Sequence, residues 1–176
     1  ALGAGALKEN TTGSTNVAVG KNCLVRCSTG TQNVCMGWQA GDHLSSGSYN
    51  TFIGYDAGSA YTTQSQQTAV GYRAMNAATG SDNTAVGYDA LLSLTTGYSV
   101  TAVGHRAMDA ATSAANSVAF GTGAGGAVTT ASAAAYVGTS AGSSVTTGDA
   151  NTCLGHSSGS SITTGSYNIC LGYDAE

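Results

Sequence analysis

The sequence predicts an all-β protein, a parallel β-solenoid (β-roll) with one coil of backbone per 17 residues and about eleven rungs. The first observation behind this prediction is a glycine that returns along the whole chain, with nine of the ten intervals 17 residues long and one 16. A fixed period in this range is typical of solenoids, in which each repeat packs only against its neighbours. The repeat glycines are Gly3, Gly20, Gly37, Gly54, Gly71, Gly87, Gly104, Gly121, Gly138, Gly155 and Gly172. Residues 1–176 are therefore expected to form a single repeat array.

Two further columns of residues keep the same phase as the glycine. The residue directly before it is always apolar, which we interpret as a wall of the core: Leu2, Val19, Met36, Ile53, Val70, Val86, Val103, Phe120, Val137, Leu154 and Leu171. The residue three places after it is always small, which indicates close packing: Ala6, Cys23, Ala40, Ala57, Ala74, Ala90, Ala107, Ala124, Ala141, Ser158 and Ala175. A disordered chain has no physical reason to keep such columns in phase.

Each coil is predicted to contain two short strands and two corners. The four residues before the glycine, such as 83–86, alternate in direction and favour an extended backbone. The glycine supplies the freedom in φ that a corner needs. Eight residues after the glycine stands a Ser or Thr, which we interpret as part of a second strand entering a turn. No helix is expected, because no sustained apolar pattern has a helical period.

The composition argues against several classes of partner. Charged residues make up 8% of the chain, and the formal net charge is −4 with only five Lys and Arg. So little positive charge argues against nucleic acid. No run of about 20 apolar residues is present, so membrane insertion is not expected. The outermost coils show no atypical capping repeat, which predicts that the array is a segment of a longer fibre.

The predicted strands carry apolar residues on both faces, although a 17-residue coil encloses only a narrow core. One isolated solenoid would therefore expose an apolar stripe along its whole length. We expect several identical chains to pack side by side around an axis, most simply as a homotrimer. Which face lines the core and which forms the interface stays open at the level of sequence.

The repeat resembles those of known fibre proteins. Residues 83–91 (NTAVGYDAL), followed by residues 95–97 (TTG), resemble the NTAVGYNAL…TTGS repeats of bacteriophage tail fibres and related marine viral fibres. Residues 116–121 (NSVAFG) are similar, less specifically, to the coils in the heads of YadA-like trimeric autotransporter adhesins. The resemblance covers the whole chain and implies homotrimers of parallel β-rolls that act as host-surface adhesins. The 17-residue unit is longer than the adhesin coil, and the leading Asn is missing from the repeats of Gln67, Val100 and Ala134.

These features together predict a structural or adhesive segment of a phage tail fibre or cell-surface adhesin. Its location would be the virion or the cell exterior, and its partner a host-surface glycan or protein receptor. A self-assembling extracellular filament subunit is an alternative. An ice-binding β-solenoid is a further one, but paired threonines such as Thr146 and Thr147 are adjacent, and adjacent side chains of a strand face opposite ways.

The position directly after the glycine carries aromatic rings on five successive coils: Trp38, Tyr55, Tyr72, Tyr88 and His105. Two interpretations are open. The rings can form a stacked ladder that stiffens the rod, or they can form a glycan-binding stripe, because aromatic faces pair with the apolar faces of sugar rings.

The next position along the coil alternates in charge on consecutive coils, at Asp56, Arg73, Asp89 and Arg106. Each of these charges is predicted to stand close to opposite charges, which would fix the register of the coils. If the pairs are exposed, each contributes only about 0.2 to 1 kcal/mol to stability.

No catalytic residue, metal site or cofactor is expected. His105 and His156 share a column but stand three coils apart, and His43 occupies a different position in its coil, so the three cannot converge on one ion. No carboxylate pair or activated nucleophile is evident, so the chain is not expected to be an enzyme. The five cysteines, Cys23, Cys27, Cys35, Cys153 and Cys170, are interpreted as small buried thiols rather than disulfides.

Overall fold

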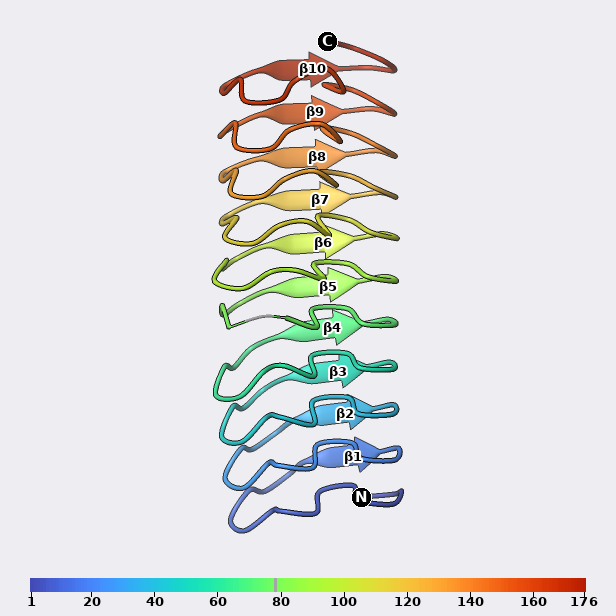
Figure 1. Ribbon diagram of the computed structural model, residues 1–176, viewed down its shortest axis with the longest axis vertical. Helices are drawn as coiled ribbons and strands as arrows, with labels where there is room; N and C mark the ends of the chain where they lie inside the picture. The colour runs from blue at the N-terminus through green and yellow to red at the C-terminus, as the bar shows by residue number, and fades with distance from the viewer. Residues whose placement is uncertain (78) are drawn as a thin grey trace.

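One three-residue strand from each of ten coils contributes to a single parallel sheet, in which the strands stack in sequence order along a rod (Figure 1). The structure, a computed structural model, describes residues 1–77 and 79–176. Each strand pairs in register with the next, for example Thr84 with Thr101. The strands are β1 (Val17–Val19), β2 (Val34–Met36), β3 (Thr51–Ile53), β4 (Thr68–Val70), β5 (Thr84–Val86), β6 (Thr101–Val103), β7 (Val118–Phe120), β8 (Ala135–Val137), β9 (Thr152–Leu154) and β10 (Ile169–Leu171). The predicted all-β parallel solenoid is confirmed, with no helix in the described residues.

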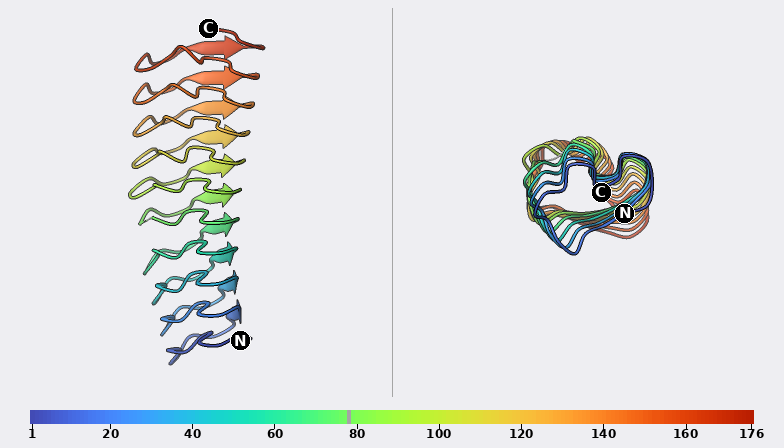
Figure 2. Two further views of the ribbon diagram at one scale, coloured as in Figure 1. Left: turned by 45° about the vertical axis from the view of Figure 1, so that its right-hand side comes forward. Right: turned by 90° about the horizontal axis from the view of Figure 1, so that it is seen from below.

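The first coil adds a partial rung below β1, because Leu2 forms an isolated parallel bridge with Val19. Seen along the rod, successive coils nearly superpose (Figure 2). The coils are thus repeated units that add length without changing the cross-section.

The prediction of two strands per coil was wrong, because the hydroxyl segment forms bends and turns instead. Besides the repeat glycine, three residues with positive φ interrupt the extended backbone in a typical coil, Asp82 (62°), Asp89 (53°) and Leu91 (50°). In the hydroxyl segment, the N–H groups of Thr95 and Thr96 both donate to one carbonyl, that of Thr112. The Thr95 hydroxyl donates to the same oxygen at 2.9 Å. These hydroxyls therefore join neighbouring coils without forming a strand ladder.

The repeat glycine is required both by its backbone conformation and by its neighbour in the next coil. Gly87 has φ +139°, which side chains disfavour, and a Cβ built on it would collide with the carbonyl oxygen of Gly104. Its own N–H donates to the carbonyl of Val70 at 2.8 Å, which fixes the corner against the coil before. Each coil needs a glycine at this corner, so the glycine recurs in the sequence once per coil.

The central residue of each strand points into the core, while the residue before the glycine faces outward. Ala85 is fully buried, whereas Val86 beside it is half-exposed. The interpretation of the residues before the glycines as a wall of the core was therefore wrong. Because strand side chains alternate between faces, a column of Ala, Cys, Phe and Tyr is buried and the Val, Ile and Leu column is left outside.

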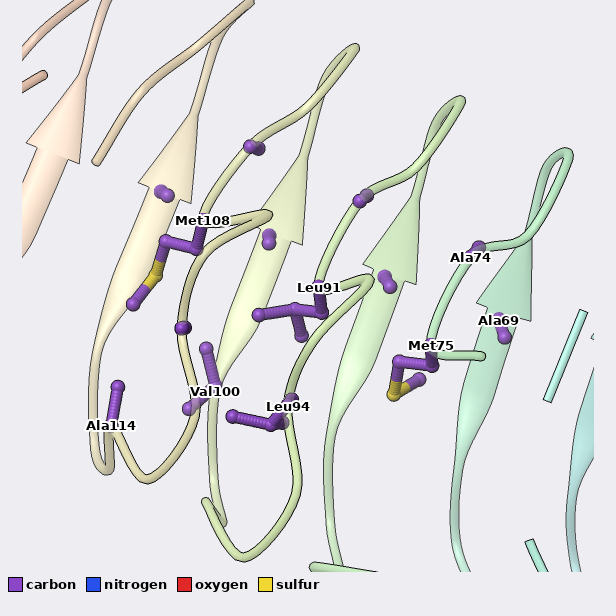
Figure 3. Close-up of a cluster of buried hydrophobic side chains, with 14 of the residues drawn as sticks. Ala69, Ala74, Met75, Leu91, Leu94, Val100, Met108 and Ala114 are labelled. Carbon is purple, nitrogen blue, oxygen red and sulfur yellow. The ribbon is translucent and has the colours of Figure 1, made fainter. Parts of the chain in front are cut away.

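The core is filled by exchanging volume between the strand and the residue four places after the glycine. Where the strand offers Ala69, the opposite side supplies Met75, and where it offers Ala85, the opposite side supplies Leu91, all fully buried (Figure 3). Where the strand carries Phe52, the opposite position is Gly58. A Cβ added to Gly58 would lie 2.5 Å from the phenylalanine ring, so no larger residue fits there. In these three coils the two residues have nearly the same total volume. The smaller pairs Cys35–Gly41 and Ala119–Gly125 instead leave space for the aromatic ring of the next coil, since a Cβ on Gly41 would lie 2.9 Å from Phe52 and one on Gly125 2.8 Å from Tyr136.

Tyr136 is the second large aromatic side chain on the inner face of the sheet, and it packs against two glycines in the same way. A Cβ on Gly125 would lie 2.8 Å from its ring, and a Cβ on Gly142 would overlap it. The phenol oxygen of Tyr136 is buried and has no hydrogen-bond partner. The nearby Asn151 amide already donates to the carbonyls of Gly148 and Gly165, so it does not serve the phenol. Burial raises the pKa of Tyr136.

The Asn that begins many repeats has a structural role. Asn50 donates from Nδ2 to Oδ1 of Asn33 at 3.0 Å, and its own Oδ1 accepts the backbone N–H of Gln67 at 3.0 Å. The same Oδ1 of Asn33 also accepts the Asn50 backbone N–H. This ladder supplies partners to buried amides that lie outside the sheet.

Candidate functional site

The aromatic residues after the glycines form a continuous stack. Ring centroids lie 4.7 Å apart for Trp38–Tyr55, 5.1 Å for Tyr55–Tyr72, 5.0 Å for Tyr72–Tyr88 and 5.3 Å for Tyr88–His105, with interplanar angles between 8° and 23°. All five side chains are exposed. The corner places one ring per coil, and the coil spacing is close to the spacing that stacked rings prefer. We call these five residues the aromatic ladder.

The stacking determines which parts of the ladder a ligand could touch. Tyr55, Tyr72 and Tyr88 each have a ring on both faces, so they present mainly ring edges to solvent. A sugar ring needs an aromatic face. Only the two ends of the ladder offer one: the face of Trp38 toward Lys21, and the face of His105 toward Thr122. A second, shorter stack joins His156 and Tyr173 at 5.2 Å.

The alternating charges next to the ladder give one close ion pair. Arg73 donates from Nε to Oδ1 of Asp89 at 3.0 Å and from Nη2 to Oδ2 at 2.9 Å. Asp89 is buried, which the sequence did not predict, while Arg73 is partly exposed. Arg106 turns instead toward Asp109 in its own coil, at 3.9 Å. The hydrogen bonds to Asp89 raise the pKa of Arg73, so the guanidinium stays charged.

Asp42 is a carboxylate with an incomplete set of partners. It is almost fully buried, and its Oδ1 accepts no hydrogen bond. His43 Nδ1 lies 3.0 Å from that oxygen, but the hydrogen bond of this nitrogen is to the Ser59 carbonyl at 2.8 Å. Burial raises the pKa of Asp42, and the charges of His43 and Arg26 partly oppose that shift.

The outer face of the sheet is a large uncharged surface, and one of its two rows is the column before the glycines that the sequence interpretation had assigned to the core. Two rows of side chains run along it, one before each strand centre and one after. The first row is Val17, Val34, Thr51, Thr68, Thr84, Thr101, Val118, Ala135, Thr152 and Ile169. The second row is Val19, Met36, Ile53, Val70, Val86, Val103, Phe120, Val137, Leu154 and Leu171. Every member is half-buried or exposed, with Phe120 57% accessible. We call these two rows the outer sheet face.

The prediction of small buried thiols is confirmed, since all five cysteines are free and buried. Burial raises the pKa of Cys27, and burial beside Cys170 raises that of Cys153 to about 11, so these two are poor nucleophiles. In residues 1–77 and 79–176, no three His, Cys, Asp or Glu side chains gather in a way that could hold a metal ion. The same part of the chain contains no helix long and apolar enough to cross a membrane.

Comparison with known proteins gives no match to a family model, a curated protein or a solved structure. The aromatic ladder and the outer sheet face are therefore the two surfaces from which a function can be inferred.

Proposed function

We propose that this chain is a structural and adhesive segment of a trimeric fibre, a phage tail fibre or a cell-surface adhesin, that supports attachment to a host. The observation that carries the proposal is the outer sheet face, which is uncharged over ten consecutive strands. At about 4.8 Å per strand and 3.3 Å per residue, this face is roughly 43 Å long and 10 Å wide. Contiguous exposed apolar patches larger than a few hundred Å² are typical of interaction sites.

The regularity of the outer sheet face favours identical chains as partners. Its two rows repeat at the coil spacing and run parallel to the rod. Copies related by rotation about an axis along the rod would bring equal coils together, so the outer sheet face of each copy would meet that of its neighbours. Two or more copies can satisfy this condition, and we propose three. The resemblance to trimeric fibre repeats supports the same number.

The assembly is tested with three substitutions of one kind. Val86→Asp places a charge on the outer sheet face, Thr96→Asp places it on an exposed position outside the sheet, and Ala85→Asp places it in the core. Wild type and Thr96→Asp should have three times the 17.2 kDa mass of the chain in light scattering. Val86→Asp should stay folded but show a mass below that of three chains, because the charge disrupts assembly. Ala85→Asp should fail to fold. A wild-type monomer, or a Val86→Asp trimer of unchanged stability, would contradict the proposal.

The adhesive role is tested by binding of the labelled, assembled protein to a panel of intact bacterial cells. Saturable binding to some strains and not to others supports host attachment. Absence of saturable binding across the panel would reject the adhesive role. If the light-scattering mass instead keeps rising with protein concentration beyond that of three chains, the result would favour a self-assembling filament.

A further inference from the structure

The N-terminal end of the aromatic ladder differs from the rest of it. Trp38 stacks on Tyr55 through one face at 4.7 Å, and its other face looks toward the preceding coil, where the equivalent position is Lys21. The backbone N–H of Gln39 donates to the carbonyl of Lys21 at 3.1 Å, so these two corners are directly adjacent. The indole face toward Lys21 is therefore not covered by another ring.

Trp38 is also held in place before any ligand arrives. Four further rings stack behind it, and the Asp56 N–H donates to its backbone carbonyl at 3.0 Å. A side chain fixed in this way loses little conformational entropy on binding. The exposed indole face is thus a preorganised, flat apolar platform.

The coils that precede this platform carry a net positive charge in a protein that is acidic overall. Residues 1–38 contain three basic residues, Lys8, Lys21 and Arg26, and one acidic residue, Glu9, which gives a net charge of +2. The remaining residues contain two basic and eight acidic residues, a net charge of −6. Lys21 is exposed and forms no ion pair within residues 1–77 and 79–176. At the other end of the ladder, Arg106 beside His105 already faces Asp109.

We propose that the free face of Trp38, together with the ammonium group of Lys21, binds a carboxylate-bearing sugar ring. The apolar face of the ring would lie on the indole, and its carboxylate would pair with Lys21 one coil below. This inference rests on the adhesive role proposed above and narrows it to one ligand class and one end of the ladder. The middle of the ladder contributes rigidity rather than contact.

Binding can be followed directly, because Trp38 is the only tryptophan in the chain. The probes are sialyllactose and a glucuronate-containing disaccharide, each compared with its neutral counterpart by titrating Trp38 fluorescence. We expect a saturable change with at least one acidic probe and an affinity at least tenfold lower for its neutral counterpart. Equal affinity for the acidic and neutral sugars, or no change with either acid, would overturn the proposal.

Variants locate the site on the surface. For these, binding is measured by saturation-transfer NMR, which does not need the indole. Trp38→Ala should weaken binding at least tenfold, Trp38→Phe less, and Lys21→Gln should remove the preference for the acidic sugar. Tyr72→Ala, in the middle of the ladder, and Lys8→Gln, a lysine outside this column, should stay within twofold of wild type. A loss at Tyr72→Ala as large as at Trp38→Ala would show that the rings act along the whole stripe and would overturn the assignment to the ladder end.

The outcome can be separated from that of the proposed function. Light scattering and cell binding are measured on the same proteins. If the wild type is trimeric and binds cells, but Trp38→Phe and Lys21→Gln bind the acidic probe as it does, this inference fails and the proposed function stands. If the wild type binds the acidic probe at Trp38 but is monomeric, the proposed assembly fails and the site stands.

Discussion

Phe52 and Gly58 offer a way to test whether side-chain volume is exchanged between the two opposite walls of one coil. The single change Phe52→Ala removes a fully buried ring and leaves a cavity, which costs about 3 to 5 kcal/mol. The single change Gly58→Met places a Cβ 2.5 Å from the Phe52 ring and a side chain at φ +59°. Overpacking costs roughly 1 to 3 kcal/mol and the left-handed conformation about 1 to 2 kcal/mol, so this change is also expected to destabilise.

The double variant Phe52→Ala/Gly58→Met recreates the pair that the next coil already contains, Ala69 with Met75. Met75 adopts φ 49° there, so methionine is compatible with this corner. The double variant should therefore lose less stability than Phe52→Ala alone, with a coupling free energy of roughly 3 kcal/mol or more. Urea unfolding of the four proteins measures it. If the two single losses simply add, the volume exchange is not what holds the coil, and the reasoning fails.

Three further perturbations have expected outcomes. Arg73→Ala leaves Asp89 buried without its partner, so it should lower the free energy of unfolding, measured in urea, clearly more than Arg106→Ala does; equal losses would contradict the burial argument. Tyr136→Phe removes a buried hydroxyl without a partner and should raise Tm by about 2 to 4 °C, and a fall in Tm would show that the hydroxyl is satisfied. Because burial raises the folded-state pKa of Asp42, its favourable contribution exists at low pH and is lost as pH rises through that pKa. Asp42→Asn should therefore raise Tm at pH 7 but not at pH 3. An equal rise in Tm at both pH values would show that ionisation of the Asp42 carboxyl is not what costs stability.

The period of the fold could be predicted from sequence because one residue type answers two physical demands at once. Gly87 and its equivalents need positive φ and close contact with the next coil, so nothing else fits and the spacing is visible directly. The stacked ladder could be predicted for a similar reason, since residues in one column of a solenoid must lie at the coil spacing. The period and the ladder both follow from which residues occupy equivalent positions in successive coils, and neither requires knowing which way a side chain points.

The direction of the strand faces could not be predicted in the same way. Both Ala85 and Val86 are apolar, and hydrophobicity alone favours the larger side chain for the core. The core is so narrow that the smaller one fits inside. A usable signal was present in the pairing of Phe52 with Gly58, since a large residue at one position accompanies a glycine at another only if both share one space. No comparable pattern in the sequence indicates that Asp89 is buried.

The columns of the rod differ in how much they vary, and the proposed roles in assembly and in recognition differ in the same way. Along the outer sheet face every side chain is aliphatic or aromatic hydrocarbon, methionine or threonine, so one coil presents much the same surface as the next. The position after the glycine changes from Lys21 to Trp38, through the tyrosines to His105, and then to Thr122. A surface that only joins identical chains needs no such change along its length, because each coil meets its own copy. A localised ligand does need it, because a site must differ from the coils around it. The corner after the glycine, held by backbone hydrogen bonds that do not depend on its side chain, is therefore where this rod can carry a specific binding site without altering its fold.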